Sequence, residues 1–177
     1  MKKFLSIILL LSINISIFAS ANEDLIRNIV IDDLGGVKRA IKKEADVNIR
    51  IRDLTPLMIA SGRGNIDVVN ALLEANADPN VVGDNGKTAL TIALRRNQLK
   101  VAEALIQKGA DINAKDDKGV TPLMWAVYEG RSETVKFIID NKGDVNIANN
   151  IDKSALRYAK EKNNKEIIKM LEEAGAE

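Results

Sequence analysis

The chain has 177 residues and contains neither histidine nor cysteine. Their absence excludes disulfides, thiolate nucleophiles, Ser-His-Asp triads and zinc sites with the usual ligands, which are the commonest means of building a catalytic or metal centre. Lys and Arg number 26 against 25 Asp and Glu, so the charge balance predicts neither nucleic acid nor an anionic membrane as the partner.

Residues 1–21 have the features of a secretory signal peptide. Two lysines precede an apolar run that ends at Phe18, and Ala19-Ser20-Ala21 places small residues at the cleavage positions. The run is short against the roughly 20 residues that a helix needs to cross a bilayer, which favours cleavage after Ala21 over retention as a membrane anchor. No cysteine follows the run, so a lipoprotein anchor is excluded.

Cleavage would leave residues 22–177 as the mature protein. Because the signal segment carries two lysines and no acidic residue, the mature part has 24 basic and 25 acidic residues. The short lysine-led signal and the abundance of Ile, Lys and Asn are typical of a bacterial protein. We therefore expect a monomer that is exported to the periplasm or the exterior and has no membrane contact once the signal is removed.

A motif recurs with a fixed spacing of 33 residues through the rest of the chain. Its four copies are Thr55–Ala60, Thr88–Ala93, Thr121–Ala126 and Ser154–Ala159. A second motif, Ala/Gly-Asp-x-Asn, keeps step with the first at Ala45–Asn48, Ala77–Asn80, Ala110–Asn113 and Gly143–Asn146, with one interval of 32. A constant period of this length predicts stacked repeats, in which each unit buries its apolar face against its neighbours.

Each repeat is predicted to hold two helices separated by a tight turn. Thr55 can cap the first helix through its hydroxyl while Pro56 takes the first helical position. The left-handed residue that ends this helix is expected at Gly64, Asn97, Gly130 and Asn163. The second helix carries apolar residues at one-turn spacing, among them Leu72 and Leu105, which we expect in the core.

These motifs resemble the ankyrin repeat family, whose consensus has a Thr-Pro-Leu-His-x-Ala helix start, a glycine ending the first helix, and a Gly-Ala-Asp-Val-Asn turn into a β-hairpin. The resemblance covers the chain from about residue 22 to its end. It implies an all-α fold: an ankyrin-repeat solenoid of stacked helix-turn-helix units joined by β-hairpin loops. The expected segments are a signal peptide at 1–21, an N-terminal capping repeat at 22–50, repeats at 51–82, 83–115 and 116–148, and a C-terminal capping repeat at 149–177.

The sequence departs from this consensus at two positions of the repeat. The motif histidine is absent from all four copies, where the chain has Met58, Thr91, Met124 and Arg157. We expect the two methionines to fill the space of that histidine. The hairpin glycine of the inner copies is replaced in the outer copies by Asp53 and Asp152, which predicts less regular loops there. A one-residue deletion falls in the first of these loops.

The carboxylates form no predicted catalytic or metal site. One turn residue repeats four times, as Asp46, Asp78, Asp111 and Asp144, and is expected to bond the backbone of its turn. Segments 84–86 and 116–119 resemble a calcium loop faintly, but each lacks the later glutamate and falls where a hairpin tip is expected. We predict no cofactor, no metal and no enzymatic activity. A hydrolase that uses carboxylates alone is the one enzyme that the composition allows.

The resemblance implies that a protein partner binds the hairpin tips and the ends of the first helices, which line the concave face. Carried over by position, the residues expected to contact the partner are Arg63, Arg95, Arg96, Tyr128, Glu129, Lys162 and Arg52. Arginine and tyrosine lead this set because they are enriched in interface hot spots. Trp125 aligns with Ile59, Ile92 and Tyr158, and we expect it to pack inward rather than touch a partner.

The predicted function is therefore non-enzymatic binding of a protein partner, as a periplasmic helper or protector of another protein. A toxin-neutralising immunity protein and a secreted effector are alternatives within the same class. A structural module of an envelope assembly is the alternative of a different class.

Overall fold

The computed structural model describes residues 20–177, and the chain divides into two compact units, Met1–Asp78 and Pro79–Glu177. The predicted signal segment lies outside the described residues, apart from Ser20 and Ala21. None of the helices in residues 20–177 has the length and apolar character that crossing a membrane requires.

The first unit begins with a helix at residues 20–30, followed by α2 (Leu34–Lys42), α3 (Pro56–Arg63) and α4 (Ile66–Glu74). Side chains from both of the first two helices are fully buried, with Leu25 and Val37 at 0% exposure. These helices form the helical pair expected for an N-terminal cap, although this pair lacks the Thr-Pro-Leu start of the other repeats.

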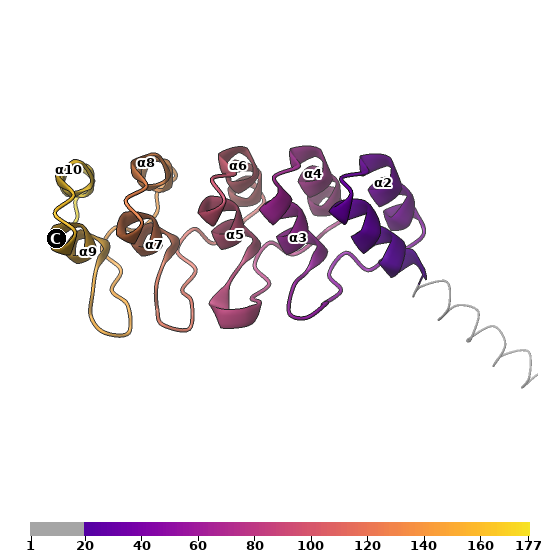
Figure 1. The fold of residues 1–177 in the computed structure, drawn as a ribbon, viewed down its shortest axis with the longest axis horizontal. Coiled ribbons are helices and arrows are strands. Elements are labelled where there is room, and N and C mark those ends of the chain that lie inside the picture. The colour runs from indigo at the N-terminus through magenta and orange to yellow at the C-terminus, as the bar shows by residue number, and fades with distance from the viewer. Residues whose placement is uncertain (1–19) are drawn as a thin grey trace, which may run out of the picture. The chain divides into compact units, whose positions relative to one another are not determined.

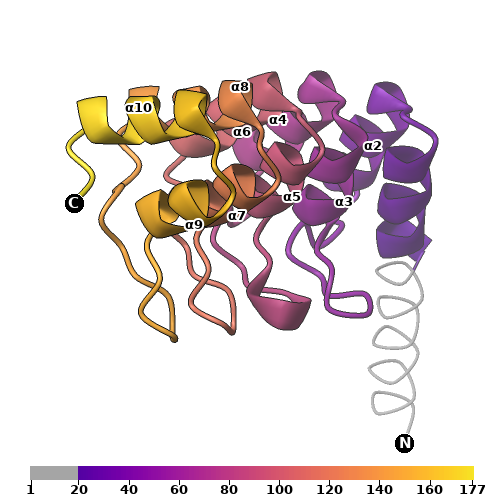
Figure 2. The ribbon, with the colours of Figure 1, turned by 60° about the vertical axis from the view of Figure 1, so that its left-hand side comes forward.

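The second unit repeats a pair of short helices three times. Its elements are a 3-10 turn η1 (Asp84–Gly86), then α5 (Ala89–Arg95), α6 (Leu99–Gln107), α7 (Pro122–Tyr128), α8 (Ser132–Asp140), α9 (Ala155–Glu161) and α10 (Lys165–Glu173). Within this unit α5, α7 and α9 lie in one row and α6, α8 and α10 in a second, and the loops extend from the first row (Figures 1 and 2). The predicted all-α class built from helix-turn-helix units is confirmed.

The first helix of each repeat begins and ends at the residues that the sequence predicted. The hydroxyls of Thr55, Thr88, Thr121 and Ser154 each accept a hydrogen bond from the backbone N–H three residues later. The turn after the helix contains the predicted left-handed residue in all four copies, with φ of 83° at Gly64, 58° at Asn97, 71° at Gly130 and 54° at Asn163. Gly64 follows its helix directly, whereas one residue separates each of the other three from the helix end. Glycine and asparagine tolerate this conformation best, which explains why the motif uses them.

A second left-handed position follows the second helix of each repeat, and the sequence analysis missed it. The same position is occupied by Glu44, Asn76, Gly109, Lys142 and Gly175, with φ between 62° and 85°. A side chain with a Cβ atom is strained there. Lys142 and Glu44 therefore carry a cost that Gly109 and Gly175 avoid.

Asparagine side chains connect successive repeats within each unit. Asn48 accepts a hydrogen bond from the N–H of Asp78 at 2.8 Å, and its own amide donates to the carbonyl of Asn76 at 3.2 Å. The same acceptor bond recurs in the second unit, from Asp111 to Asn80 at 2.9 Å and from Asp144 to Asn113 at 2.8 Å. We call this set the asparagine ladder.

The repeated aspartate has the structural role that the sequence predicted. The carboxylates of Asp46, Asp111 and Asp144 each accept a bond from the N–H two residues later, at 2.8–2.9 Å. These bonds close local turns and hold the ladder asparagine in place. No group of three or more acidic side chains within residues 20–177 is arranged to hold a metal ion.

The loops of the second unit are regular, including the one expected to be irregular. The N–H of Gly83, Asp116 and Asn149 donates in each loop to the carbonyl four residues later, at 2.8–3.1 Å. Asp152 takes a φ of 58° where the equivalent Gly119 has 73°, so it fits the same loop. The prediction of an irregular loop at Asp152 is therefore wrong.

The loop of the first unit is shorter, as the one-residue deletion implied. The N–H of Ile51 donates to the carbonyl of Leu54 at 2.9 Å, and the reverse bond is 3.1 Å long. Both residues between them, Arg52 and Asp53, have positive φ, of 47° and 63°. Two-residue hairpins favour this geometry because it matches the twist of the flanking chain.

The buried residues confirm the predicted core. Leu72 and Leu105 are both at 0% exposure, and Met58 and Met124 are buried where the motif histidine would stand. Thr91 replaces that histidine differently, because its hydroxyl accepts a bond from the N–H of Thr88 at 2.9 Å and completes a capping box. Ser61 is an exception in this apolar surrounding: its buried hydroxyl has no hydrogen-bond partner.

Candidate functional site

Trp125 does not pack into the core, contrary to the prediction. Its side chain is half-buried, and so are those of Ile59, Ile92 and Tyr158 at the same position of the other repeats. The neighbouring positions Met124 and Ala126 are buried. The alignment of the repeats identified the equivalent positions correctly. The conclusion that an apolar residue at this position faces the core was wrong.

Two arginines stack on the Trp125 ring. The guanidinium carbon of Arg95 lies 4.9 Å from the ring centroid, and that of Arg131 lies 5.0 Å from it. Arg95 comes from the last turn of α5, whereas Arg131 directly precedes α8. A guanidinium held against an indole keeps all its N–H donors available for a ligand.

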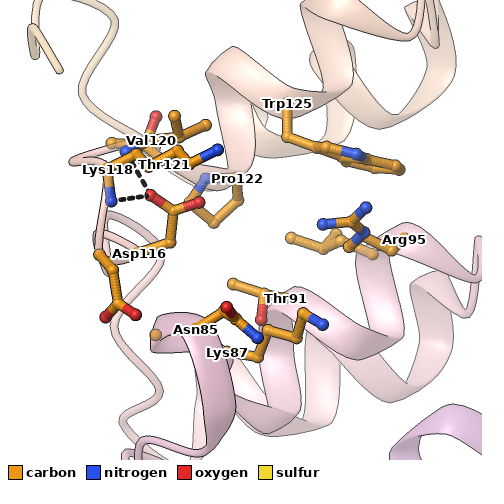
Figure 3. Close-up of a pocket in the computed structure, with 13 residues that line it drawn as sticks. Asn85, Lys87, Thr91, Arg95, Asp116, Lys118, Val120, Thr121, Pro122 and Trp125 are labelled. Carbon is orange, nitrogen blue, oxygen red and sulfur yellow. Dashed lines mark hydrogen bonds between the residues drawn. The ribbon is translucent and has the colours of Figure 1, made fainter. Parts of the chain in front are cut away.

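A groove of about 210 Å³ separates α5 from the loop that leads into α7. Trp125 and Arg95 close one end of it, and Lys87 and Thr91 line the α5 side (Figure 3). Asp116 faces it from the opposite loop (Figure 3), where one carboxylate oxygen accepts bonds from the N–H groups of residues 118 and 120.

A second aromatic cluster lies one repeat further along the second unit. The rings of Tyr128 and Tyr158 meet edge to face with centroids 6.1 Å apart. The ammonium of Lys162 lies 4.0 Å from the Tyr128 centroid, and that of Lys153 lies 5.3 Å from the Tyr158 centroid. Tyr128 is nevertheless 51% exposed, which is unusual for a large ring and leaves it available to a partner.

The Tyr158 ring is fixed from two directions. Its hydroxyl accepts a hydrogen bond from the side-chain amide of Asn149 at 2.9 Å. Lys153 also pairs with Glu161 at 2.8 Å, and this hydrogen bond is the main cause that lowers the pKa of the Glu161 carboxyl below its ordinary value. The second cluster is therefore largely pre-organised before any partner arrives.

The structure separates the residues that the sequence grouped as a partner-binding set. Arg95 joins the Trp125 cluster, and Tyr128 and Lys162 join the tyrosine cluster. Arg96 and Glu129 are exposed residues that follow α5 and α7, outside both clusters.

Two of the predicted partner-binding residues, Arg63 and Arg52, belong to the first unit. Arg63 forms a two-pronged ion pair with Asp32, with N–O distances of 3.1 and 2.8 Å. Arg52 is exposed at the tip of the tight hairpin, in the left-handed conformation. That Arg63 and Arg52 contact the same partner as the residues of the second unit stays a prediction.

Most of the described aromatic side chains belong to the Trp125 cluster and the tyrosine cluster, and we call the surface that carries these two clusters the aromatic and cationic face. Residues 20–177 contain four aromatic residues, Trp125, Tyr128, Phe137 and Tyr158. Three of them belong to the two clusters, on the first helices α7 and α9. Aromatic residues placed outside a core, beside cations, are typical of protein-binding surfaces.

Comparison with known families agrees with the repeat architecture. The family model for ankyrin repeats, in three copies, matches residues 27–116 and again residues 113–177. The chain belongs to the ankyrin-repeat family. Ankyrin repeats are generally protein–protein interaction modules and are typically non-enzymatic scaffolds. No curated protein matched the sequence.

Some site residues of this ankyrin-repeat protein escaped the sequence analysis. Arg131 lies outside the positions carried over as first-helix ends and hairpin tips, yet it stacks on the Trp125 ring. Lys153, expected only as part of a hairpin tip, stacks on the Tyr158 ring. The spacing does contain a signal for Arg131, because it lies six residues after Trp125, across the turn between α7 and α8. That signal is useful only once Trp125 is known to lie outside the core.

Proposed function

We propose that the protein binds another protein through the aromatic and cationic face of its second unit, and that it does so after export from a bacterial cell. The observation that carries the proposal is the gathering of Trp125, Tyr128 and Tyr158 beside Arg95, Arg131, Lys153 and Lys162. Such a surface offers large contact area at low entropic cost, because stacking already restricts its side chains.

The finer role that we propose is that of a periplasmic helper or protector of another protein. The signal-like segment 1–21 supports export, and the absence of cysteine from the sequence suits a fold that does not depend on disulfides. A short array of rigid repeats presents its side chains without ordering first, which suits sustained binding to a folded partner.

Affinity capture from a periplasmic extract tests the proposal, with quantitative mass spectrometry comparing three baits. The wild-type protein and a Lys100→Ala control, altered at an exposed residue of the outer helix α6, are expected to retain the same partner. Tyr128→Ala is expected to deplete that partner at least tenfold, about 1.4 kcal/mol. Equal recovery by all three baits would contradict the proposed face.

The identity and stoichiometry of the captured protein distinguish the roles. A single folded enzyme supports the helper, and a toxin supports an immunity protein. Several envelope proteins in fixed proportion would instead support a structural module.

A further inference from the structure

The groove beside Trp125 is lined by cations that form no ion pair with a described residue, which is also true of Arg131 and Lys162 in the two clusters. Elsewhere in residues 20–177 many cations have a carboxylate partner, as in the pairs Arg63–Asp32 and Lys153–Glu161. None of Lys87, Arg95 and Lys118, which line the groove, forms an ion pair with another described residue. The lining also holds the carboxylates of Asp116 and Asp117, so its three cations leave the groove with a net charge of +1.

Arg95 is prepared to bind a carboxylate. Its guanidinium is held 4.9 Å from the Trp125 centroid, so less side-chain entropy is lost when it forms a two-pronged bond. Lys87 lies on the same side of the groove, as Figure 3 shows, and adds a second donor. Trp125 and Val120, both half-buried, supply an apolar surface beside these charges.

The size of the groove limits what it can hold. Its volume of about 210 Å³ is below the roughly 300–1,000 Å³ that is usual for pockets that bind drug-sized ligands. It suits one or two side chains of an extended chain better than a cofactor. Asp116 at the loop end repels a carboxylate, so an acidic residue is directed toward the Arg95 end (Figure 3).

We infer that this groove binds an extended acidic segment of the partner protein, with a Glu or Asp side chain on Arg95 and an adjacent aliphatic side chain against Trp125. This inference rests on the proposed function, since it names the chemistry of the partner at part of the same face. Binding of the acidic segment depends on Arg95, whereas the test of the proposed function substitutes Tyr128.

Trp125 is the only tryptophan of the sequence, so its fluorescence reports directly on the groove. The probes are two capped pentapeptides, Glu-Glu-Leu-Glu-Glu and Gln-Gln-Leu-Gln-Gln, titrated at low salt into the protein. The glutamate peptide is expected to change Trp125 emission saturably and to shift amide NMR signals of residues 85–95 and 116–125. The glutamine peptide is expected to bind at least tenfold more weakly. Added salt should lower the affinity of the glutamate peptide but not that of the glutamine peptide.

Variants at neighbouring arginines separate the groove from general electrostatics. Arg95→Gln is expected to weaken binding of the glutamate peptide at least tenfold, about 1.4 kcal/mol. Arg95→Lys should lose less affinity, because lysine keeps the positive charge but cannot form the two-pronged bond of a guanidinium. Arg96→Gln removes the same charge one residue away and should have a clearly smaller effect. Amide spectra of each variant, recorded without peptide, establish that it is folded.

Three results would overturn the inference. They are the absence of any response to the glutamate peptide, equal binding of both peptides, and equal losses from the Arg95 and Arg96 variants. A partner that is captured through Tyr128 but is indifferent to Arg95→Gln would likewise refute the acidic segment while leaving the proposed function intact.

Discussion

Arg63 and Asp32 form a two-pronged ion pair within the first unit, which joins the end of α3 to the turn after the helix at residues 20–30. Asp32 occupies the position of Gly64 in the next repeat and takes the same left-handed conformation, with φ of 59°. Arg63 was predicted to contact a partner because of its position alone. The pair shows that it also holds the capping repeat to its neighbour.

This pair predicts a pH-dependent contribution to stability. The hydrogen bond from Arg63 is the main cause that lowers the pKa of Asp32 below its ordinary value of 3.8. A carboxyl whose pKa is lowered by folding stabilises the protein above its unfolded pKa, and this contribution is lost as the pH falls through the lowered value. Asp32→Asn should therefore lower the melting temperature at pH 7, and the difference from wild type should shrink below about pH 4.

A double-mutant cycle with Arg63→Gln provides the check on that pH dependence. The coupling between the two substitutions should be present at pH 7 and should disappear in acid. Because both side chains are partly exposed, the effect should be modest and should decrease with salt. A pH-independent coupling would mean that packing, not charge, joins the two residues.

Ser61→Ala should stabilise the protein by about 1 kcal/mol. The substitution removes a buried hydroxyl that lacks a hydrogen-bond partner, and alanine is also the better helix former. Urea denaturation followed by circular dichroism measures the change. Loss of stability would indicate that a water or another group satisfies this hydroxyl in solution.

Lys142→Gly should also stabilise the protein, by about 1 kcal/mol, because the φ of 63° at this position is strained for any residue with a Cβ atom. Lys142→Ala is the matched control, since it removes the same charge and keeps the Cβ atom. Thermal melts should place the glycine variant above wild type and the alanine variant near it. Equal shifts in both variants would attribute the effect to the lysine side chain instead.

Leu72→Ala and Leu105→Ala should each cost about 2–5 kcal/mol, because both side chains are fully buried and truncation leaves a cavity. One substitution lies in each compact unit, so the pair compares the two cores. Chemical denaturation measures both losses. A change within about 0.5 kcal/mol of wild type, the range of ordinary surface substitutions, would contradict this packing.

The mature chain is predicted to begin at Asn22, as the small residues at positions 19–21 indicate. Cleavage there preserves the bond from the N–H of Asp46 to the Asn22 side chain, which is 2.7 Å long. Intact-mass measurement on the exported protein decides the matter. A product that retains Met1 and fractionates with membranes would show that the segment remains as an anchor.

The repeat sequence predicts the fold well because its signals are local. The hydroxyl cap at Thr55 and the left-handed Gly64 each depend on only a few neighbouring residues, and both stand where the motif placed them. The asparagine ladder was missed because its bonds join residues about 30 positions apart. Such partners become visible only when the period is converted into a stack.

The site was harder to predict, for a related reason. The position within the repeat identified Arg95, Tyr128 and Lys162 as site residues. It did not reveal how exposed the position of Trp125, one turn before Tyr128, would be. Trp125 was assigned to the core because aliphatic residues share its position. The position itself is half-buried in every repeat, for isoleucine as well as tryptophan, and the arginines on the Trp125 ring come from α5 and the start of α8.

The asparagine ladder also makes the opening of individual repeats measurable. The N–H groups of Asp78, Asp111 and Asp144 lie at the surface, where free amides exchange rapidly with solvent, yet each is bonded to an asparagine of the preceding repeat. Their hydrogen-exchange rates therefore report the separation of one repeat from the one before it, rather than the melting of any helix. Ranking the three rates would show where along the chain the protein begins to come apart.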